Sequence, residues 1–462
     1  MKRLPLFFLV VLLVIAPGLG CRGGSKKAQD ALLEEITLDW WRVFDGYDAV
    51  RPIVERYNEL HPNVRINYRR LRFEEYEEAL IRAFAEGRGP DIFSIHNTWI
   101  KEYQPLIEPL PKSIKVVFRE ERGTLKKEVV PVVKEVPTIT LRKLEERFVE
   151  IVPQDVVRPY SPTPQEPAEN RVWGLPTSLD TLALYYNRDL LNSAGIPTPP
   201  ETWRDFQNTV KTLTRIDAQN RIVQAGAALG TADNVERASD ILSVIMMQNG
   251  TQVANPSTGY ASFAEVIPGQ TGELPAASAL RFYTDFANPI KEVYTWNNDQ
   301  PNSFDAFTNG QTAFFFGYSY HVPLIEARNP KLNFSVAKLP QISGGRVVNA
   351  ANYWVETVAK DSPHVDEAWD FIQFLTTNTE NVTEHLERVR RPTALRELIN
   401  TQIEDATLNA FVSQVLTAKS WYKGSDADAA EEAMLDLIRR VPTADRLDDE
   451  LRRAQNLINQ TI

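Results

Sequence analysis

Apolar residues recur with two different periods along the first part of the chain. Segments 36–41, 64–71 and 91–95 are rich in apolar and β-branched residues, and 64–71 alternates apolar with polar positions, which is typical of strands. Segments 48–60 and 73–86 space their apolar residues three or four apart, which predicts amphipathic helices. Strands that alternate with helices through short links predict a parallel sheet with helices on its faces.

The same segment indicates which side chains face the core and where a ligand would bind. In the second helix, Phe73, Tyr76, Leu80 and Phe84 fall on one stripe, so we expect them to face the core. Open α/β sheets bind ligands beyond the carboxyl ends of their strands. Those ends are residues 42–45 and 96–99.

The pattern is interrupted at residues 111–170 and resumes after residue 172. The interrupting segment is rich in Lys, Glu, Val and Pro, and we interpret it as an insertion with one helical stretch at 141–148. From residue 380 onward the chain is nearly all helical in pattern. The expected strands are 182–186, 312–316 and 334–339, and the expected helices are 202–214, 235–248, 275–286 and 364–375. These elements predict an α/β fold with a helical C-terminal segment.

Composition narrows the function. The chain has 462 residues and a formal net charge of −10, which argues against a nucleic-acid partner because such proteins carry a basic surface. Five histidines and one cysteine leave little room for a zinc cluster or a disulfide framework. We therefore expect no metal and no cofactor.

The N-terminus has the pattern of an export signal. Lys2 and Arg3 precede an apolar run at 4–16, and small residues lead to Cys21. The run is shorter than the about 20 residues that span a bilayer and is typical of a signal peptide at 1–20. The position of the sole cysteine resembles a bacterial lipobox, although Gly18 stands where leucine is preferred. We expect lipidated Cys21 to anchor the protein outside the cytoplasm through a flexible tether at 21–30. The alternative is an ordinary secretory signal with an incidental cysteine.

Four local motifs share an order and spacing with one family. They are Gly-Pro-Asp-Ile at 89–92, Trp-Gly-Leu-Pro at 173–176 with Tyr-Tyr-Asn-Arg-Asp-Leu-Leu at 185–191, Pro-Pro-Glu-Thr-Trp at 199–203, and residues 304–317, which contain Gly310 and Ala313 before an apolar strand. Each motif is weak alone. Together they resemble the extracellular solute-binding proteins of the maltodextrin and oligosaccharide type.

The resemblance implies a two-lobed periplasmic-binding-protein-like fold with a hinge. The N-lobe would comprise residues 31–175 and 342–390, including the insertion, and the C-lobe 176–341 and 391–462. The chain would cross between the lobes near 174–178, 338–340 and 390–392. Such lobes close on a ligand by hinge motion.

A sugar ring offers an apolar C–H face and a rim of hydroxyls, so its site needs aromatic platforms with carboxylates. The resemblance places Asp180 at the cleft beside the first crossing, and the alternative is that Asp180 braces the hinge. Asp45, after the first strand, is the second expected sugar-binding acid, and the alternative is that it is an acidic residue favoured at a helix N-terminus. For each tryptophan the alternative is packing in the core. Trp40 and Trp41 point to opposite faces, so one belongs to the core. The further expected ligand-binding residues are Asp45, Trp41, Trp99, Tyr318, Tyr320, Tyr353, Trp354, Arg391 and Trp421.

The resemblance implies a monomer that captures a carbohydrate and delivers it to the permease subunits of an ABC importer. Nucleophile-elbow, phosphate-loop and zinc-protease motifs do not occur in the sequence, so we expect no enzymatic activity. Two alternatives remain: a secreted sugar-binding scaffold or sensor lipoprotein, and a glycoside hydrolase, because paired carboxylates are available.

Overall fold

The computed structural model describes residues 35–462 except 124–127, 164, 256–257 and 266–272. The expected signal peptide, Cys21 and the tether lie outside the described residues. Within the described residues, no helix is long and apolar enough to cross a membrane.

The N-lobe is built on a four-stranded sheet with the order β15–β3–β1–β2. β1 pairs in parallel with both β2 and β3, which confirms the parallel arrangement predicted from the sequence, and β15 adds an antiparallel edge. Trp40 is fully buried against Phe371 of α13, so Trp40 is the core member of the Trp40–Trp41 pair. The elements are β1 (Ile36–Val43), α2 (Tyr47–Leu60), β2 (Val64–Leu71), α3 (Phe73–Ala85), β3 (Ile92–His96), α4 (Ile100–Tyr103), β15 (Trp354–Val358), α13 (Val365–Thr377) and α14 (Thr379–Val389).

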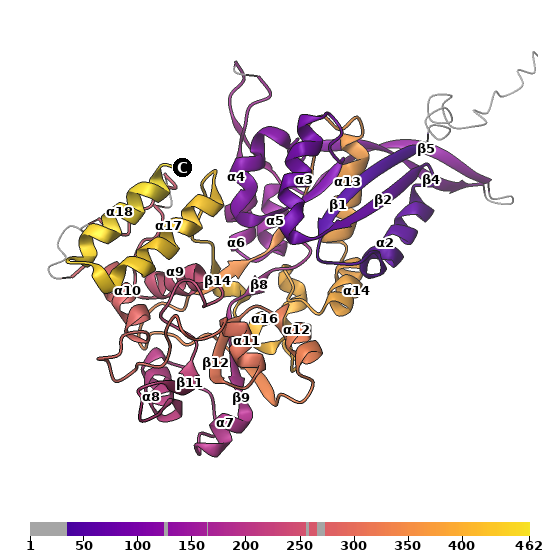
Figure 1. The fold of residues 1–462 in the computed structure, drawn as a ribbon. Helices are drawn as coiled ribbons and strands as arrows, with labels where there is room; N and C mark the ends of the chain where they lie inside the picture. Colours follow the sequence, from indigo (N-terminus) through magenta and orange to yellow (C-terminus); the bar gives the residue numbers. More distant parts are fainter. Residues whose placement is uncertain (1–34, 124–127, 164, 256–257, 266–272) are drawn as a thin grey trace, which may run out of the picture.

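The segment at 111–170 forms two hairpins and two short helices. The helical stretch predicted at 141–148 is present, but the first hairpin, which extends away from the N-lobe sheet at the right of Figure 1, was not predicted. Its strands pair antiparallel along their full length, and β4 packs against α13. The elements are β4 (Ser113–Arg122), β5 (Glu128–Pro137), α5 (Leu141–Arg147), α6 (Ile151–Val156), β6 (Val157–Tyr160) and β7 (Glu169–Val172).

The C-lobe is built on a five-stranded mixed sheet with the order β10–β11–β12–β9–β13. Its central strand β12 is buried along its whole length, as expected for a continuous apolar run. The elements are β9 (Ala183–Asn187), α7 (Arg188–Ser193), α8 (Trp203–Leu213), β10 (Arg215–Ile216), β11 (Ile222–Ala227), α9 (Ala238–Gln248), α10 (Pro275–Asp285), α11 (Ser303–Thr308), β12 (Thr312–Gly317), α12 (His321–Arg328), β13 (Phe334–Ala337), α17 (Ala427–Arg440) and α18 (Leu447–Asn459).

A small sheet with the order β16–β14–β8 joins the lobes, and β8 and β14 lie between the two lobes in Figure 1. Its strands are β8 (Asp180–Thr181), β14 (Asn349–Asn352) and β16 (Ala418–Lys419). Core membership changes from one lobe to the other at these strands, between residues 179 and 182, 350 and 353, and 418 and 422.

The second and third crossings therefore lie later in the chain than residues 338–340 and 390–392. Val348 and Ala350 pack in the C-lobe core, whereas Leu395, Leu398 and Val412 pack in the N-lobe core. The physical reason is that apolar residues of segment 394–418 pack in the N-lobe core, including Ile399 of α15 (Ile399–Gln402) and Val412 of α16 (Asn409–Val412). Phe411 of α16 packs instead with C-lobe residues.

Candidate functional site

Three aromatic rings gather at the edge of the N-lobe sheet where the parallel strands end. Phe44 follows β1, Phe73 follows β2, and Trp354 begins the antiparallel strand β15. The rings of Phe44 and Phe73 stack with centroids 6.0 Å apart, and Trp354 meets them edge-on at 5.7 and 6.2 Å. Phe44 and Phe73 are 49% and 50% exposed. We call these three residues the aromatic cluster.

The aromatic cluster contains two residues that the sequence did not assign to the site. Phe73 was expected to face the core with Tyr76 and Leu80, and only the latter two are buried. The difference arises because Phe73 is the first residue of α3, where its ring stacks on Phe44 instead of packing in the core. Phe44 has a positive φ of 69°, a conformation that is costly for a bulky residue and is concentrated at functional sites.

Ion pairs beneath the aromatic cluster fix the end of β1. The Asp45 carboxylate pairs with Arg391 over 2.8 Å and with Arg42 over 3.4 Å. Burial raises the pKa of Asp45, but the two guanidinium groups outweigh that effect and hold its pKa below the ordinary value. The Arg391 guanidinium also lies 5.9 Å from the centroid of the Phe44 ring. The expected site residues Asp45 and Arg391 are therefore brought together, each engaged with the other.

A second buried carboxylate holds Arg42 from the opposite side. Glu356 accepts from Arg42 Nε over 3.0 Å, and its other oxygen accepts from Trp40 Nε1 and from the Ser94 hydroxyl, both over 2.8 Å. Glu356 is 1% exposed and Arg42 is 4% exposed. This network connects β1, β3 and β15 directly below the aromatic cluster.

On the C-lobe side, the loop after β12 presents a tyrosine pair. Tyr318 is fully buried and its hydroxyl donates to Asp240 over 2.7 Å. Tyr320 is 38% exposed and stacks on Tyr318 with ring centroids 6.1 Å apart. The sequence left the choice between these residues open, and the structure identifies Tyr320 as the one with an accessible ring.

Arg237 lies beside this tyrosine pair. Its guanidinium pairs with Asp240 over 2.6 Å and lies 5.7 Å from the centroid of the Tyr318 ring. Its backbone is left-handed, with φ of 60°, directly before α9 begins. No sequence motif singled out Arg237, because its position depends on the turn that precedes the helix.

His96 lies beside the aromatic cluster, with its ring centroid 5.7 Å from that of Trp354. His96 at the end of β3 bonds to Asn352 over 3.0 Å and to Thr98 over 2.7 Å. Burial lowers the pKa of His96 to about 4, and the positive charge of Arg237 from the other lobe contributes to that lowering.

The Asp180 carboxylate accepts three hydrogen bonds from neighbouring residues. One carboxylate oxygen accepts from Ser319 N–H over 2.8 Å and from the Ser319 hydroxyl over 2.6 Å, and the other accepts from Thr181 N–H over 2.8 Å. Burial raises the pKa of Asp180 from 3.8 to about 6, against the lowering by these donors. Asp180 joins the first crossing to the loop that carries Tyr320, which favours the bracing role over direct sugar binding.

Three other expected residues are buried or partly buried in the structure. Trp99 is 7% exposed and stacks on Tyr103 in the N-lobe core. Trp41 is partly buried beneath Arg69, whose guanidinium lies 4.5 Å from the ring centroid. Tyr353 is 2% exposed and donates its hydroxyl to Asp155 over 2.8 Å. Apolar packing in the N-lobe accounts for the burial of Trp99 and Tyr353.

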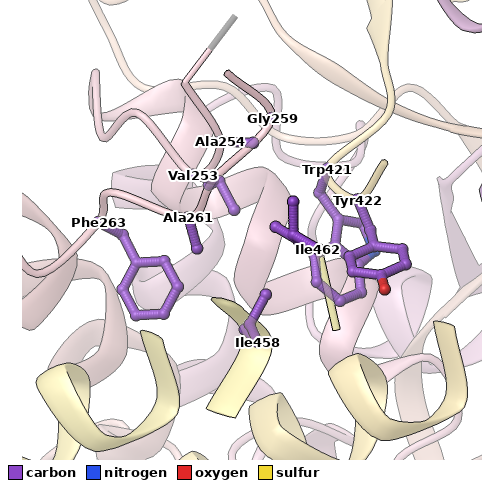
Figure 2. Close-up of a pocket in the computed structure, with 9 residues that line it drawn as sticks. All are labelled: Val253, Ala254, Gly259, Ala261, Phe263, Trp421, Tyr422, Ile458 and Ile462. Carbon is purple, nitrogen blue, oxygen red and sulfur yellow. The ribbon is translucent and has the colours of Figure 1, made fainter. Parts of the chain in front are cut away.

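Trp421 lies apart from the aromatic cluster. It lines a small apolar pocket in the C-lobe, between the loop around Val253 and the end of α18 (Figure 2). The other residues at this pocket are Ala254, Gly259, Ala261, Phe263, Tyr422, Ile458 and Ile462. Among the described residues, no group of three or more His, Cys, Asp or Glu side chains could hold a metal ion.

Comparison with known proteins identifies relatives of this fold. A galactooligosaccharide-binding protein of Bacillus subtilis is 20% identical over 257 residues, 54% of this chain and 55% of that protein. The chain thus spans about half the length of the curated relatives it matches.

Solved structures match over nearly the whole chain. A cyclo/maltodextrin-binding protein complexed with maltotetraose has a TM-score of 0.68 and 14% identity, and covers 92% of this chain and 96% of its own. A cyclic alpha-maltosyl-1,6-maltose binding protein from Arthrobacter globiformis has a TM-score of 0.67 and 18% identity, with 92% and 98% covered. These similarities confirm the predicted fold.

The family profile of bacterial extracellular solute-binding proteins matches residues 44–382. The match begins at Phe44 in the aromatic cluster and ends within α14, so it includes the chain segments that carry Arg237, Tyr320 and Trp354. Proteins of this family bind solutes and are not enzymes, which agrees with the prediction from the sequence. The chain belongs to the bacterial extracellular solute-binding protein family.

Proposed function

We propose that this protein captures a carbohydrate between the aromatic cluster and the Tyr320 loop and delivers it to an ABC importer. The observation that carries the proposal is the exposure of the stacked Phe44 and Phe73 rings at the carboxyl edge of the N-lobe sheet. Exposed apolar patches on a soluble protein mark binding sites, and this edge is where α/β sheets bind ligands.

The chemistry of the two edges suits a sugar. The aromatic rings offer flat apolar faces for the C–H face of a pyranose, and the Tyr320 ring lies on the opposite lobe. The side chains of Arg237 and Arg391 are partly exposed, and a guanidinium group can donate hydrogen bonds to hydroxyl oxygens. The names of the relatives, which bind galactooligosaccharides, maltodextrins and a cyclic maltosyl-maltose, support an oligosaccharide.

Three chain crossings at one small sheet support a hinge mechanism. A ligand that contacts both lobes binds the closed conformation more tightly than the open one, because it makes more contacts when the lobes are closed. It therefore stabilises the closed conformation. We infer that closure creates the surface which the permease subunits of the importer recognise, and that the protein acts as a monomer.

Titration calorimetry with a panel of maltotetraose, galactooligosaccharides, amino acids and polyamines tests the proposal. We expect binding to an oligosaccharide only. Phe44→Ala and Phe73→Ala should each weaken that binding by about 1–2 kcal/mol, roughly five- to thirtyfold, because each removes an aromatic contact face.

Tyr260→Ala is the matched control, because Tyr260 is 50% exposed in the C-lobe and belongs to neither edge. It should leave affinity unchanged. Binding of amino acids or polyamines but of no sugar would refute the carbohydrate class. Sugar affinity that survives both phenylalanine substitutions would place the site elsewhere.

We also propose that Cys21 carries the lipid that holds the protein at the outer face of the membrane. In a bacterium with lipoprotein processing, Cys21→Ala should move the protein from the membrane to the soluble fraction, because acyl chains supply the membrane affinity. Fractionation at high salt measures this, and a Ser25→Ala variant serves as the control. A Cys21→Ala protein that still sediments with membranes would contradict the anchor.

A further inference from the structure

Helix α6 of the 111–170 segment lies against the third crossing. The Lys423 ammonium lies 3.0 Å from a carboxylate oxygen of Asp155 and donates to the main-chain oxygen of Gln154 over 3.0 Å. The Ser420 hydroxyl donates to the other Asp155 oxygen over 2.6 Å. Ser420 directly follows β16, where the chain passes from the N-lobe core to the C-lobe core, and Lys423 lies three residues further along.

The same carboxylate also binds the second crossing. Tyr353, the residue after β14, donates its hydroxyl to Asp155 over 2.8 Å. Asn97, which follows β3, connects these two crossings a second time, because its amide donates to Ser420 over 2.9 Å and its main-chain N–H donates to Tyr353 over 3.0 Å. Asp155 is 3% exposed, and its buried charge is matched by Lys423, Tyr353 and Ser420.

We propose that Asp155 is a positioning residue of the hinge, which locks the second and third crossings to the N-lobe so that the lobes rotate about one fixed pivot. Hinge motions are absorbed by a few residues at the ends of elements, and one carboxylate here holds such residues on two of the three crossings. The first crossing is braced separately, by Asp180 and Ser319. The proposal assigns a role to the 111–170 segment. Only its consequence for sugar binding rests on the proposed function.

The consequence is a narrow range of interlobe arrangements before ligand arrives. Without the Asp155 carboxylate, Tyr353 and Ser420 lose their shared acceptor and Lys423 loses its charged partner, so the two crossings are held together less tightly, by Asn97 and the pairing of β14 with β16. A more mobile hinge must lose more conformational entropy when the lobes close on a ligand. Affinity should then fall although every residue that contacts the ligand is unchanged.

Spin labels measure the pivot directly and without a ligand. In the full chain with Cys21→Ala, labels at Glu59→Cys on α2 and Asn208→Cys on α8 report the interlobe distance, since both positions are exposed on different lobes. Electron–electron double resonance should give a clearly broader distance distribution for Asp155→Ala than for the parent protein. Asp155→Asn, which keeps acceptors for Tyr353 and Ser420, should restore most of the narrow distribution.

Glu145→Ala is the matched control, because it removes an exposed carboxylate from α5, another helix of the same 111–170 segment. It should leave the distribution unchanged. If Asp155→Ala does not fold, Tyr353→Phe and Lys423→Met each remove one partner and should broaden the distribution to a smaller extent. The proposal is overturned if the distribution for Asp155→Ala matches that of Glu145→Ala. If Asp155→Ala does not fold, the same result for both single-partner variants overturns it.

Calorimetry with maltotetraose adds the functional readout. If maltotetraose binds the parent protein, Asp155→Ala should weaken it about three- to tenfold. If no sugar of the panel binds the parent protein, the carbohydrate function fails, while the distance distributions still decide the role of Asp155.

Discussion

Replacing Glu356 by alanine is expected to lower the free energy of unfolding by about 3–5 kcal/mol, a large fraction of the about 5–15 kcal/mol typical of proteins. The substitution leaves the buried Arg42 guanidinium with Asp45 alone, at 3.4 Å, and removes the acceptor of Trp40 Nε1 and the Ser94 hydroxyl. A buried charge that loses its nearest partner is costly because water cannot take that partner's place. Denaturant unfolding of the unliganded protein measures the loss.

Two companion variants separate charge from hydrogen bonding. Glu356→Gln keeps an acceptor for Trp40 or Ser94 but not the charge, so we expect a loss between those of the parent and the alanine variant. Glu55→Ala removes an exposed carboxylate of α2 and should change stability by less than about 0.5 kcal/mol. A Glu356→Ala loss of that small size would contradict the view that the network below the aromatic cluster stabilises the N-lobe.

The regular elements could be predicted from the sequence because their signals are local. The alternation of Val64, Ile66 and Tyr68 gave β2 with its exact bounds, and the spacing of Val50, Ile53 and Val54 marked the buried face of α2. Periodicity reports which face of an element is buried, and that information needs no knowledge of the partner.

The crossings could not be predicted in the same way. Segment 394–418 has a helical pattern, but a pattern of apolar residues does not say which lobe covers it, and the structure places Leu395 and Val412 in the N-lobe core. The second crossing lies after residue 350 because Val348 and Ala350 still pack in the C-lobe core. Both facts depend on contacts between residues that are far apart in the sequence.

The candidate site was predicted in part, for a related reason. Strand ends at 42–45 and 96–99 were identified correctly as the edge of the parallel sheet. Which aromatic residues are exposed there depends on single backbone conformations, such as the positive φ of Phe44, and on burial by distant elements. Trp99 and Phe73 exchanged their expected roles, since the tryptophan packs in the core and the phenylalanine is exposed.

Asp180→Ala is expected to destabilise the unliganded protein, and more so at acid pH. The substitution removes the acceptor of three hydrogen bonds, including two main-chain N–H groups, in a buried position. Each buried donor left without an acceptor lowers the free energy of unfolding by up to about 3 kcal/mol. We therefore expect a melting temperature several degrees below that of the parent protein at neutral pH.

The pH dependence follows from the raised pKa of Asp180, which is about 6 in the folded protein against an ordinary value of 3.8. Between these values the folded state binds more protons at this group than the unfolded state does, so its contribution to stability falls as pH rises from about 4 to 6. The contribution of Asp180 to the free energy of unfolding falls by about 2 kcal/mol between pH 4.5 and pH 7.5. Because alanine cannot titrate, the difference in unfolding free energy between parent and variant should be larger at pH 4.5 by about that amount.

Asp361→Ala, which removes an exposed carboxylate, is the control for general effects of charge on acid stability, and its difference from the parent should not change over this range.

Sugar affinity distinguishes the two roles that the sequence left open for Asp180. If Asp180 braces the first crossing against Ser319, stability falls and affinity changes little. A variant with unchanged melting temperature at both pH values and a ten- to hundredfold weaker affinity, about 1.5–3 kcal/mol, would instead show that the carboxylate binds the ligand and that its internal hydrogen bonds are exchanged for sugar hydroxyls on closure.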